Sequence, residues 1–111
     1  MQVNIKRLEG QVAVVIPEGR LDLASASEFK QALNDAVNAG DRILVVDLSK
    51  VPFVDSSGLG ALISGMKATR LAGGDLRIAQ VGEQARLILE LTTLDKVMKL
   101  YPTVEEAIGD N

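Results

Sequence analysis

Apolar positions along the chain follow two periods, and the change from one to the other predicts the order of its secondary-structure elements. Short runs of aliphatic and β-branched residues, some alternating at period 2, indicate strands. Longer segments with an apolar residue every three or four positions indicate amphipathic helices. Strands are expected at 3–8, 12–16, 43–48, 76–81 and 97–100, and helices at 25–39, 57–71, 84–91 and 104–108.

This alternation of strands and helices predicts an α/β fold with a single, mostly parallel sheet. The run at 43–48 is apolar up to Asp47, which is typical of a strand buried on both faces and therefore central. The weaker pattern at 3–8, followed by a Glu-Gly turn, indicates an antiparallel strand at the N-terminal edge of the sheet.

Local signals predict how the helices begin and pack. Ser25 and Glu28 have the spacing of a capping box, in which the serine oxygen accepts from the first turn and the glutamate bonds back. Gly60 and Gly65 lie within the predicted helix at 57–71. We expect them to let that helix pack closely on the sheet.

The composition limits the chemistry that the chain can perform. Its 111 residues predict one domain, 1–111, and 47% of them are apolar but only 3% aromatic, so aliphatic residues must form the core. Cysteine and histidine are absent, which excludes disulfides, thiolate chemistry and imidazole catalysis. Interspersed charges with a net charge of -3 argue against a nucleic-acid or anionic-membrane surface. Because imidazole and thiolate chemistry are excluded, we do not expect an enzyme. With no secretory signal or membrane-length apolar run, we expect a cytoplasmic protein.

The segment V-P-F-V-D-S-S-G-L-G at 51–60 contains the strongest candidate site. It joins the central strand to the next helix, and sites in parallel sheets gather at the carboxyl ends of strands. Asp55 is followed there by two adjacent hydroxyls, those of Ser56 and Ser57. A helix cap explains one hydroxyl, but neither the second hydroxyl nor the acid before both.

Catalytic and nucleotide-binding interpretations of this segment fit poorly. V-D-S-S-G lacks the first glycine of G-x-S-x-G, and no histidine is available as a base. A dinucleotide motif beginning at G-L-G would need glycine at Ile63, and a P-loop would need lysine at Met66. A serine modified by another protein fits better. Phosphate at a helix N-terminus is favoured by the free amides and adds about -1.5 to -2 charges to the surface.

Two other acids are candidates for the same surface. Asp22 follows the strand at 12–16 and precedes the next helix, so it lies at the same carboxyl edge. It is either an ordinary loop residue or part of the site. Asp47 lies inside the central strand without the acidic pair that would hold magnesium, and we interpret it as structural.

These residues resemble the STAS domain, and specifically the small anti-sigma-factor antagonists (anti-anti-sigma factors) of bacteria. The likeness runs through V-A-V-V-I-P-E-G-R-L-D, I-L-V-V-D-L-S-K-V-P-F-V-D-S-S-G-L-G-A-L, G-G-D-L-R-I-A-Q-V, L-I-L-E-L-T-T-L-D-K-V and E-E-A-I, so it covers nearly the whole chain. D-S-S-G-L-G is the specific motif. Arg20 departs from the family, which often has an acid there. The resemblance implies successive β-α units with helices mainly on one face of the sheet.

The resemblance also implies a mechanism of partner switching. Ser56 would be phosphorylated by the partner anti-sigma factor, an ATP-dependent serine kinase, and a metal-dependent phosphatase would remove the phosphate. The unphosphorylated form would bind that partner and release its sigma factor. No cofactor of the chain itself is implied, because ATP and magnesium belong to the kinase. The implied partner-binding residues are Asp22, Asp55, Ser57, Gly58 and Leu59.

Two alternatives of other classes remain open. In the first, the chain is a phosphorylation-independent scaffold or a subunit of a transport complex, and the Ser56 loop only docks. In the second, it is an enzyme, which the hydroxyl beside a carboxylate suggests chemically.

Overall fold

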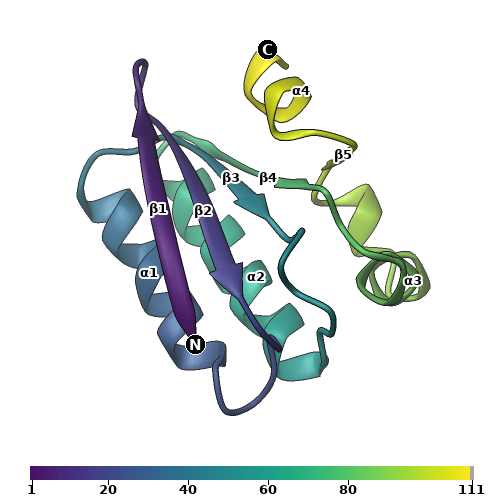
Figure 1. Cartoon of the computed structure of the whole chain (residues 1–111). Helices are drawn as coiled ribbons and strands as arrows, with labels where there is room; N and C mark the ends of the chain where they lie inside the picture. Colours follow the sequence, from purple (N-terminus) through teal and green to yellow (C-terminus); the bar gives the residue numbers. More distant parts are fainter. Residues whose placement is uncertain (111) are drawn as a thin grey trace.

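The computed structural model describes residues 1–110 of the chain, as one sheet with helices on both sides (Figure 1). The strands are β1 Gln2–Leu8, β2 Val12–Glu18, β3 Ile43–Asp47, β4 Asp75–Ala79 and β5 Leu100–Tyr101. The helices are α1 Ala26–Asn38, α2 Ser56–Leu71, α3 Glu83–Leu91 and α4 Val104–Gly109, with a 3-10 helix, η1 Leu94–Lys96, before β5.

The five strands lie in the sheet in the order in which they occur in the sequence. β1 pairs with β2 antiparallel, and every later neighbour pair is parallel. β3 is the middle strand, and all of its residues after Ile43 are buried. The predicted α/β fold, with its antiparallel N-terminal edge and its central strand at 43–48, is therefore confirmed.

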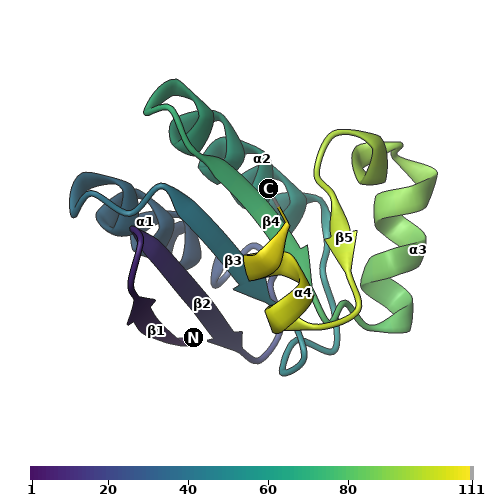
Figure 2. The same ribbon diagram turned by 90° about the horizontal axis from the view of Figure 1, so that it is seen from above.

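The two faces of the sheet carry separate apolar layers, because successive side chains of a strand point to opposite sides. In β3, Leu44 and Val46 face the main core, together with residues of α1, α2 and α3. Val45 faces a smaller cluster that includes Ala107 of α4. Figure 2 shows α4 on the opposite side of the sheet from α1 and α2. Helices thus lie mainly on one face, as predicted.

The predicted strand at 97–100 is wrong in position. β5 contains only Leu100 and Tyr101, which pair with Ile78 and Ala79 of β4. The residues that precede β5 form a 3-10 turn instead of a strand, because Thr93 adopts the left-handed conformation (φ 57°) and η1 begins directly after it. The carbonyl of Leu94 then accepts the amides of residues 97 and 98, which leaves neither amide for a neighbouring strand.

The predicted role of the two helical glycines is also wrong. A β-carbon on Gly60 would meet no atom within 4 Å, so no close contact requires glycine there. A β-carbon on Gly65 would collide with the side chain of Leu33, which belongs to α1. Gly65 therefore lets α2 approach its neighbouring helix, and not the sheet.

The C-terminal helix is held to the sheet by polar contacts as well as by the smaller cluster. The buried Arg77 of β4 donates from Nη1 to the carbonyl of Ala107 at 2.7 Å. The Tyr101 hydroxyl donates to the Asp110 carboxylate, and Lys99 Nζ donates to the same carboxylate at 2.8 Å. Burial raises the pKa of Tyr101 above its ordinary value of 10.0, and the hydrogen bond to Asp110 raises this pKa further.

Candidate functional site

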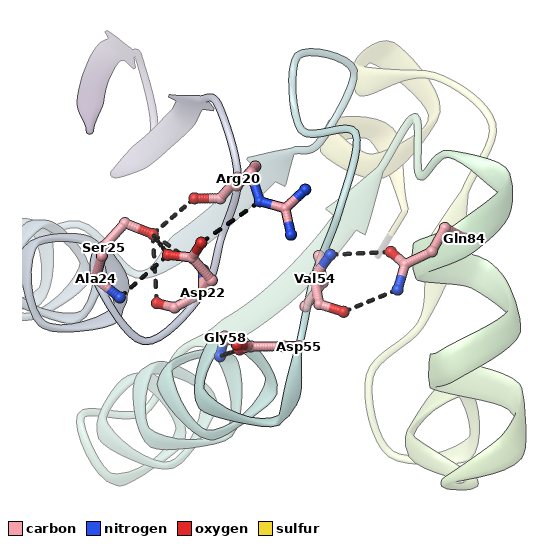
Figure 3. A network of polar contacts seen from close by, with 8 residues as sticks. All are labelled: Arg20, Asp22, Ala24, Ser25, Val54, Asp55, Gly58 and Gln84. Carbon is pink, nitrogen blue, oxygen red and sulfur yellow. Dashed lines mark hydrogen bonds and ion pairs between the residues drawn. The ribbon is translucent and has the colours of Figure 1, made fainter.

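The loops that follow β2 and β3 lie side by side at the carboxyl edge of the sheet (Figure 3), and backbone hydrogen bonds join them. Leu21 and Val54 form a parallel bridge. The Leu21 amide donates to the carbonyl of Phe53 at 2.9 Å, and the Leu21 carbonyl accepts from the Asp55 amide at 3.2 Å. The structure thus brings together the two segments that carry Asp22 and Ser56.

Asp55 caps the helix that begins at Ser56. Its backbone is extended (φ -107°, ψ -171°), and its Oδ1 accepts from the amide of Gly58 at 3.0 Å. This carboxylate satisfies one of the free amides of the first turn, and its charge is favourable at the positive end of the helix dipole. The cap is the acid, which leaves both hydroxyls available.

Ser56 and Ser57 occupy the first two positions of α2, with Ser56 exposed and Ser57 partly buried. Within residues 1–110, neither hydroxyl has a hydrogen-bond partner, and neither do the amides of these two residues. Ser56 therefore presents a free hydroxyl to solvent beside two unpaired N–H donors. This combination is suited to accept a phosphate and to stabilise it afterwards.

Gly58 and Leu59 are buried and position the loop by packing. A β-carbon on Gly58 would collide with the carbonyl oxygen of Leu21 and lie 2.9 Å from Leu21 Cγ. Leu59 is 7% exposed and belongs to the main core. Neither residue offers a side-chain surface to a partner. They fix the start of α2 against the loop that carries Asp22.

Asp22 has contacts within its own loop. Its Oδ1 accepts from the Ala24 amide at 3.1 Å, and its Oδ2 lies 3.5 Å from Arg20 Nε. The Arg20 guanidinium also lies over the ring of Phe53, 4.1 Å from its centroid. Next to this acid, Leu23 is 80% exposed. The loop therefore presents an acid, a base and an apolar side chain together.

The predicted capping box at the start of α1 is wrong. The Ser25 backbone is in the helical region (φ -114°, ψ -11°), and its hydroxyl makes no cap hydrogen bond. The hydroxyl instead donates to the Arg20 carbonyl at 2.7 Å and accepts from the Asp22 amide at 3.0 Å. Glu28 lies 3.3 Å from the amino group of Met1. Ser25 thus closes the Asp22 loop, as Figure 3 shows.

Gln84 of α3 also belongs to the site, although it is not among the residues predicted from the sequence. Its Oε1 accepts from the Val54 amide and its Nε2 donates to the Val54 carbonyl, each at 2.9 Å. The side chain therefore pairs with both backbone groups of Val54, as a neighbouring strand would (Figure 3). The two residues are 30 positions apart, and no local pattern marks this glutamine.

Two classes of feature are missing from the described part of the chain. Within residues 1–110, no three acidic, histidine or cysteine side chains are grouped so that they could hold a metal ion. No helix in the same range is both long enough and apolar enough to cross a membrane.

The fold is that of a known family of domains. The sequence matches the STAS domain over residues 2–107, and the chain belongs to this family. Within it, the chain belongs with the anti-sigma factor antagonists, which are regulatory and not catalytic proteins.

Similar proteins come from several bacteria. RsfB of Mycobacterium tuberculosis, an anti-sigma-F factor antagonist, is 31% identical over 99 residues, which are 87% of this chain and 79% of that protein. A crystal structure of a Thermotoga maritima protein, provisionally named an anti-sigma factor antagonist, has a TM-score of 0.89 at 29% identity. The alignment covers 96% of this chain and 91% of that one.

A third likeness is to SpoIIAA of Bacillus, which has been solved without and with its phosphate. The TM-scores are 0.82 and 0.75 at 20% identity, with 96% of this chain covered in both cases and 93% and 96% of those chains. At this identity the likeness shows the fold alone.

Proposed function

We propose that this chain is an anti-sigma factor antagonist controlled by phosphorylation of Ser56. The unphosphorylated form binds an anti-sigma factor that is also an ATP-dependent serine kinase, and this binding releases the sigma factor. Phosphorylation of Ser56 ends the binding, and a metal-dependent phosphatase restores it. ATP and magnesium belong to the kinase and not to this chain.

The observation that carries this proposal is the free, exposed hydroxyl of Ser56 at the first position of α2. Its neighbour Asp55 already caps the helix, so the hydroxyl has no structural role that a kinase would disrupt. The unpaired amides of Ser56 and Ser57, together with the helix dipole, favour a phosphate at this point. The fold is therefore expected to tolerate the modification.

The phosphoryl transfer needs only the Ser56 oxygen from this chain. Ser56 Oγ attacks the γ-phosphorus of ATP on the kinase, and a new O–P bond forms while the bond to the leaving ADP breaks. The hydroxyl proton passes to a base of the kinase. The phosphatase reverses the modification by hydrolysis, which returns the serine and inorganic phosphate.

The effect on binding follows from the charge that the phosphate adds. The surface around Ser56 already includes Asp22 and Asp55, and a phosphate adds about -1.5 to -2 charges beside them. A partner that docks there must desolvate the phosphate or lose contact with the loop. At a cost of about 3–4 kcal/mol, the affinity falls by about two to three decades.

Binding of matched variants to the captured kinase tests the proposal. Wild-type chain as bait retrieves the partner from a lysate of the source cells, and the purified partner is then titrated with each variant by calorimetry. Ser56→Ala is expected to bind like wild type and to stay bound when ATP is added. Ser56→Asp is expected to bind at least tenfold more weakly.

Ser57→Ala is the matched control, because it removes the adjacent hydroxyl and leaves Ser56 in place. It should still accept phosphate from ATP, at a site that mass spectrometry locates at residue 56, and it should then dissociate. Equal affinity of Ser56→Ala and Ser56→Asp for the same partner contradicts the switch. Recovery of one scaffold or transport assembly by both would favour the phosphorylation-independent alternative.

A further inference from the structure

A pocket on the second face of the sheet takes no part in the proposed switch. It lies between the outer face of β1 and β2, the ends of β3 and β4, and helix α4, which Figure 2 shows on this face. Its volume is about 480 Å³. Pockets that bind small molecules have volumes of roughly 300–1,000 Å³.

Most of the pocket wall is apolar. Val14 and Ile16 of β2 and Leu8 of β1 contribute from the sheet, because they point away from the main core. Val104 and Ile108 contribute from α4. This wall is suited to the aliphatic part of a ligand and offers it no hydrogen bonds.

A carboxylate that lines this space has one oxygen without a hydrogen-bond partner among residues 1–110. Asp47, at the end of β3, is only 8% exposed, and its Oδ1 accepts from the Ser49 amide and from Gln80 Nε2, each at 2.9 Å. Its Oδ2 has no hydrogen-bond partner within residues 1–110. In the same range, every fully buried side-chain oxygen has a partner, so Oδ2 is accessible to solvent. Asp47 lies two residues after Val45 in β3, on the same face of the sheet, and lines the pocket.

Gln80 holds this carboxylate in place. It adopts the left-handed conformation (φ 57°) directly after β4, and its amide donates to the Tyr101 carbonyl at 3.1 Å. Its side-chain amide can then reach Oδ1 of Asp47 from the neighbouring strand. The bonds from Gln80 and Ser49 both go to Oδ1 and leave Oδ2 without a donor.

We propose that this pocket binds a small organic ammonium ion with a short aliphatic body. The ammonium group would donate to Asp47 Oδ2, and the body would lie on the apolar wall. The charges that line the pocket also favour a cation, because two acids, Asp47 and Glu105, and one base, Lys6, give a net charge of -1. A charge-assisted hydrogen bond to a largely buried carboxylate is among the stronger polar contacts available to a ligand.

Three probes of equal chain length test the proposal: hexylammonium, 1-hexanol and hexanoate. Each is titrated into isotopically labelled protein at pH 7 while amide chemical shifts are recorded. Saturable shifts are expected near Val14, Ile16 and Ile108. Hexylammonium is expected to bind at least tenfold more tightly than hexanol, and hexanoate more weakly than both. No saturable shift, or equal affinity for all three probes, overturns the proposal.

Two variants separate the ligand contact from folding. Asp47→Asn keeps an oxygen for the Ser49 amide but removes the charge, so it should lower the affinity for hexylammonium about tenfold and leave hexanol unchanged. Ile108→Phe narrows the pocket without touching the carboxylate and should weaken hexylammonium and hexanol alike. It therefore tests the site even if Asp47→Asn fails to fold. Unchanged hexylammonium binding in Ile108→Phe would place the probe elsewhere.

Discussion

Replacing Gly58 with alanine tests whether α2 begins as close to the Asp22 loop as the structure shows. The new β-carbon would collide with the carbonyl oxygen of Leu21 and lie 2.9 Å from Leu21 Cγ and 3.0 Å from Val54 Cγ1. The carbonyl cannot move freely, because it accepts the amide of Asp55 and its residue forms the bridge to Val54. The collision must therefore separate the two loops.

The expected loss of stability is the difference between two opposing effects. Alanine in place of glycine within a helix is favourable by about 0.8–1.0 kcal/mol. Overpacking of a tightly packed site costs about 1–3 kcal/mol, and a fixed backbone oxygen places Gly58 at the upper end of that range. We expect Gly58→Ala to lower the free energy of unfolding by about 2 kcal/mol.

Gly60 provides a matched control two residues further along the same helix. It is exposed, and a β-carbon there would meet no atom within 4 Å. Gly60→Ala should therefore show only the gain in helix propensity, about 0.5–1 kcal/mol. The two variants would then differ by about 3 kcal/mol, although each changes one glycine of α2 to alanine.

Urea unfolding followed by circular dichroism measures this difference. With an m-value of roughly 1.5 kcal/mol/M, the two midpoints should differ by roughly 2 M. If both variants stabilise the protein alike, the start of α2 is not packed against Leu21. The assignment of Gly58 to packing would then have to be abandoned.

Three further predictions concern the site and the C-terminal contacts. Asp22→Asn keeps the acceptor for the Ala24 amide and removes the charge. It should therefore weaken binding to the proposed kinase partner with little change in Tm, and a large fall in Tm would show that the charge stabilises the fold. Gln84→Ala removes two hydrogen bonds to Val54, so the free energy of unfolding should fall by about 2 kcal/mol. The Val54 amide should also exchange its hydrogen faster with solvent, and an unchanged exchange rate would contradict the contact. Because the pKa of Tyr101 is raised above 10.0 in the folded state, its contribution is complete below pH 10 and is lost as the pH rises through the raised pKa. Thermal unfolding between pH 9 and 11 should show this loss, and a Tyr101→Phe variant with the same loss would refute it.

The sequence predicts those parts of the fold and site that depend on local pattern. The central strand is evident at 43–48 because both of its faces are buried, so its residues are apolar without alternation. The helix after D-S-S-G follows from its apolar stripe, in which Leu59, Leu62 and Met66 are all buried. The candidate serine falls at the start of this helix because the motif joins the two elements.

The features that the sequence did not predict depend on partners far away in the sequence or on the conformation of single residues. Gln84 bonds to a backbone 30 residues away, and backbone groups carry no sequence signal. Ser25 has the residue type and spacing of a cap, but its hydroxyl turns to the Arg20 carbonyl. The position of β5 depends on the left-handed conformation of Thr93. Glycine is the residue that usually indicates this conformation, so a threonine gives no signal of it.

The bonding between the loops after β2 and β3 has a consequence for the thermodynamics of recognition. Val54 forms a β-bridge with Leu21 and also bonds to the side chain of Gln84. The surface formed by the two loops is therefore ordered before a partner binds. Complexes that order mobile side chains on binding lose about 0.5–1.5 kcal/mol of free energy for each one. The two loops that carry Leu21 and Val54 therefore have little conformational entropy left to lose on binding. A phosphate on Ser56 would therefore change the charge of this surface and not its shape. We expect it to weaken the complex mainly by raising the dissociation rate.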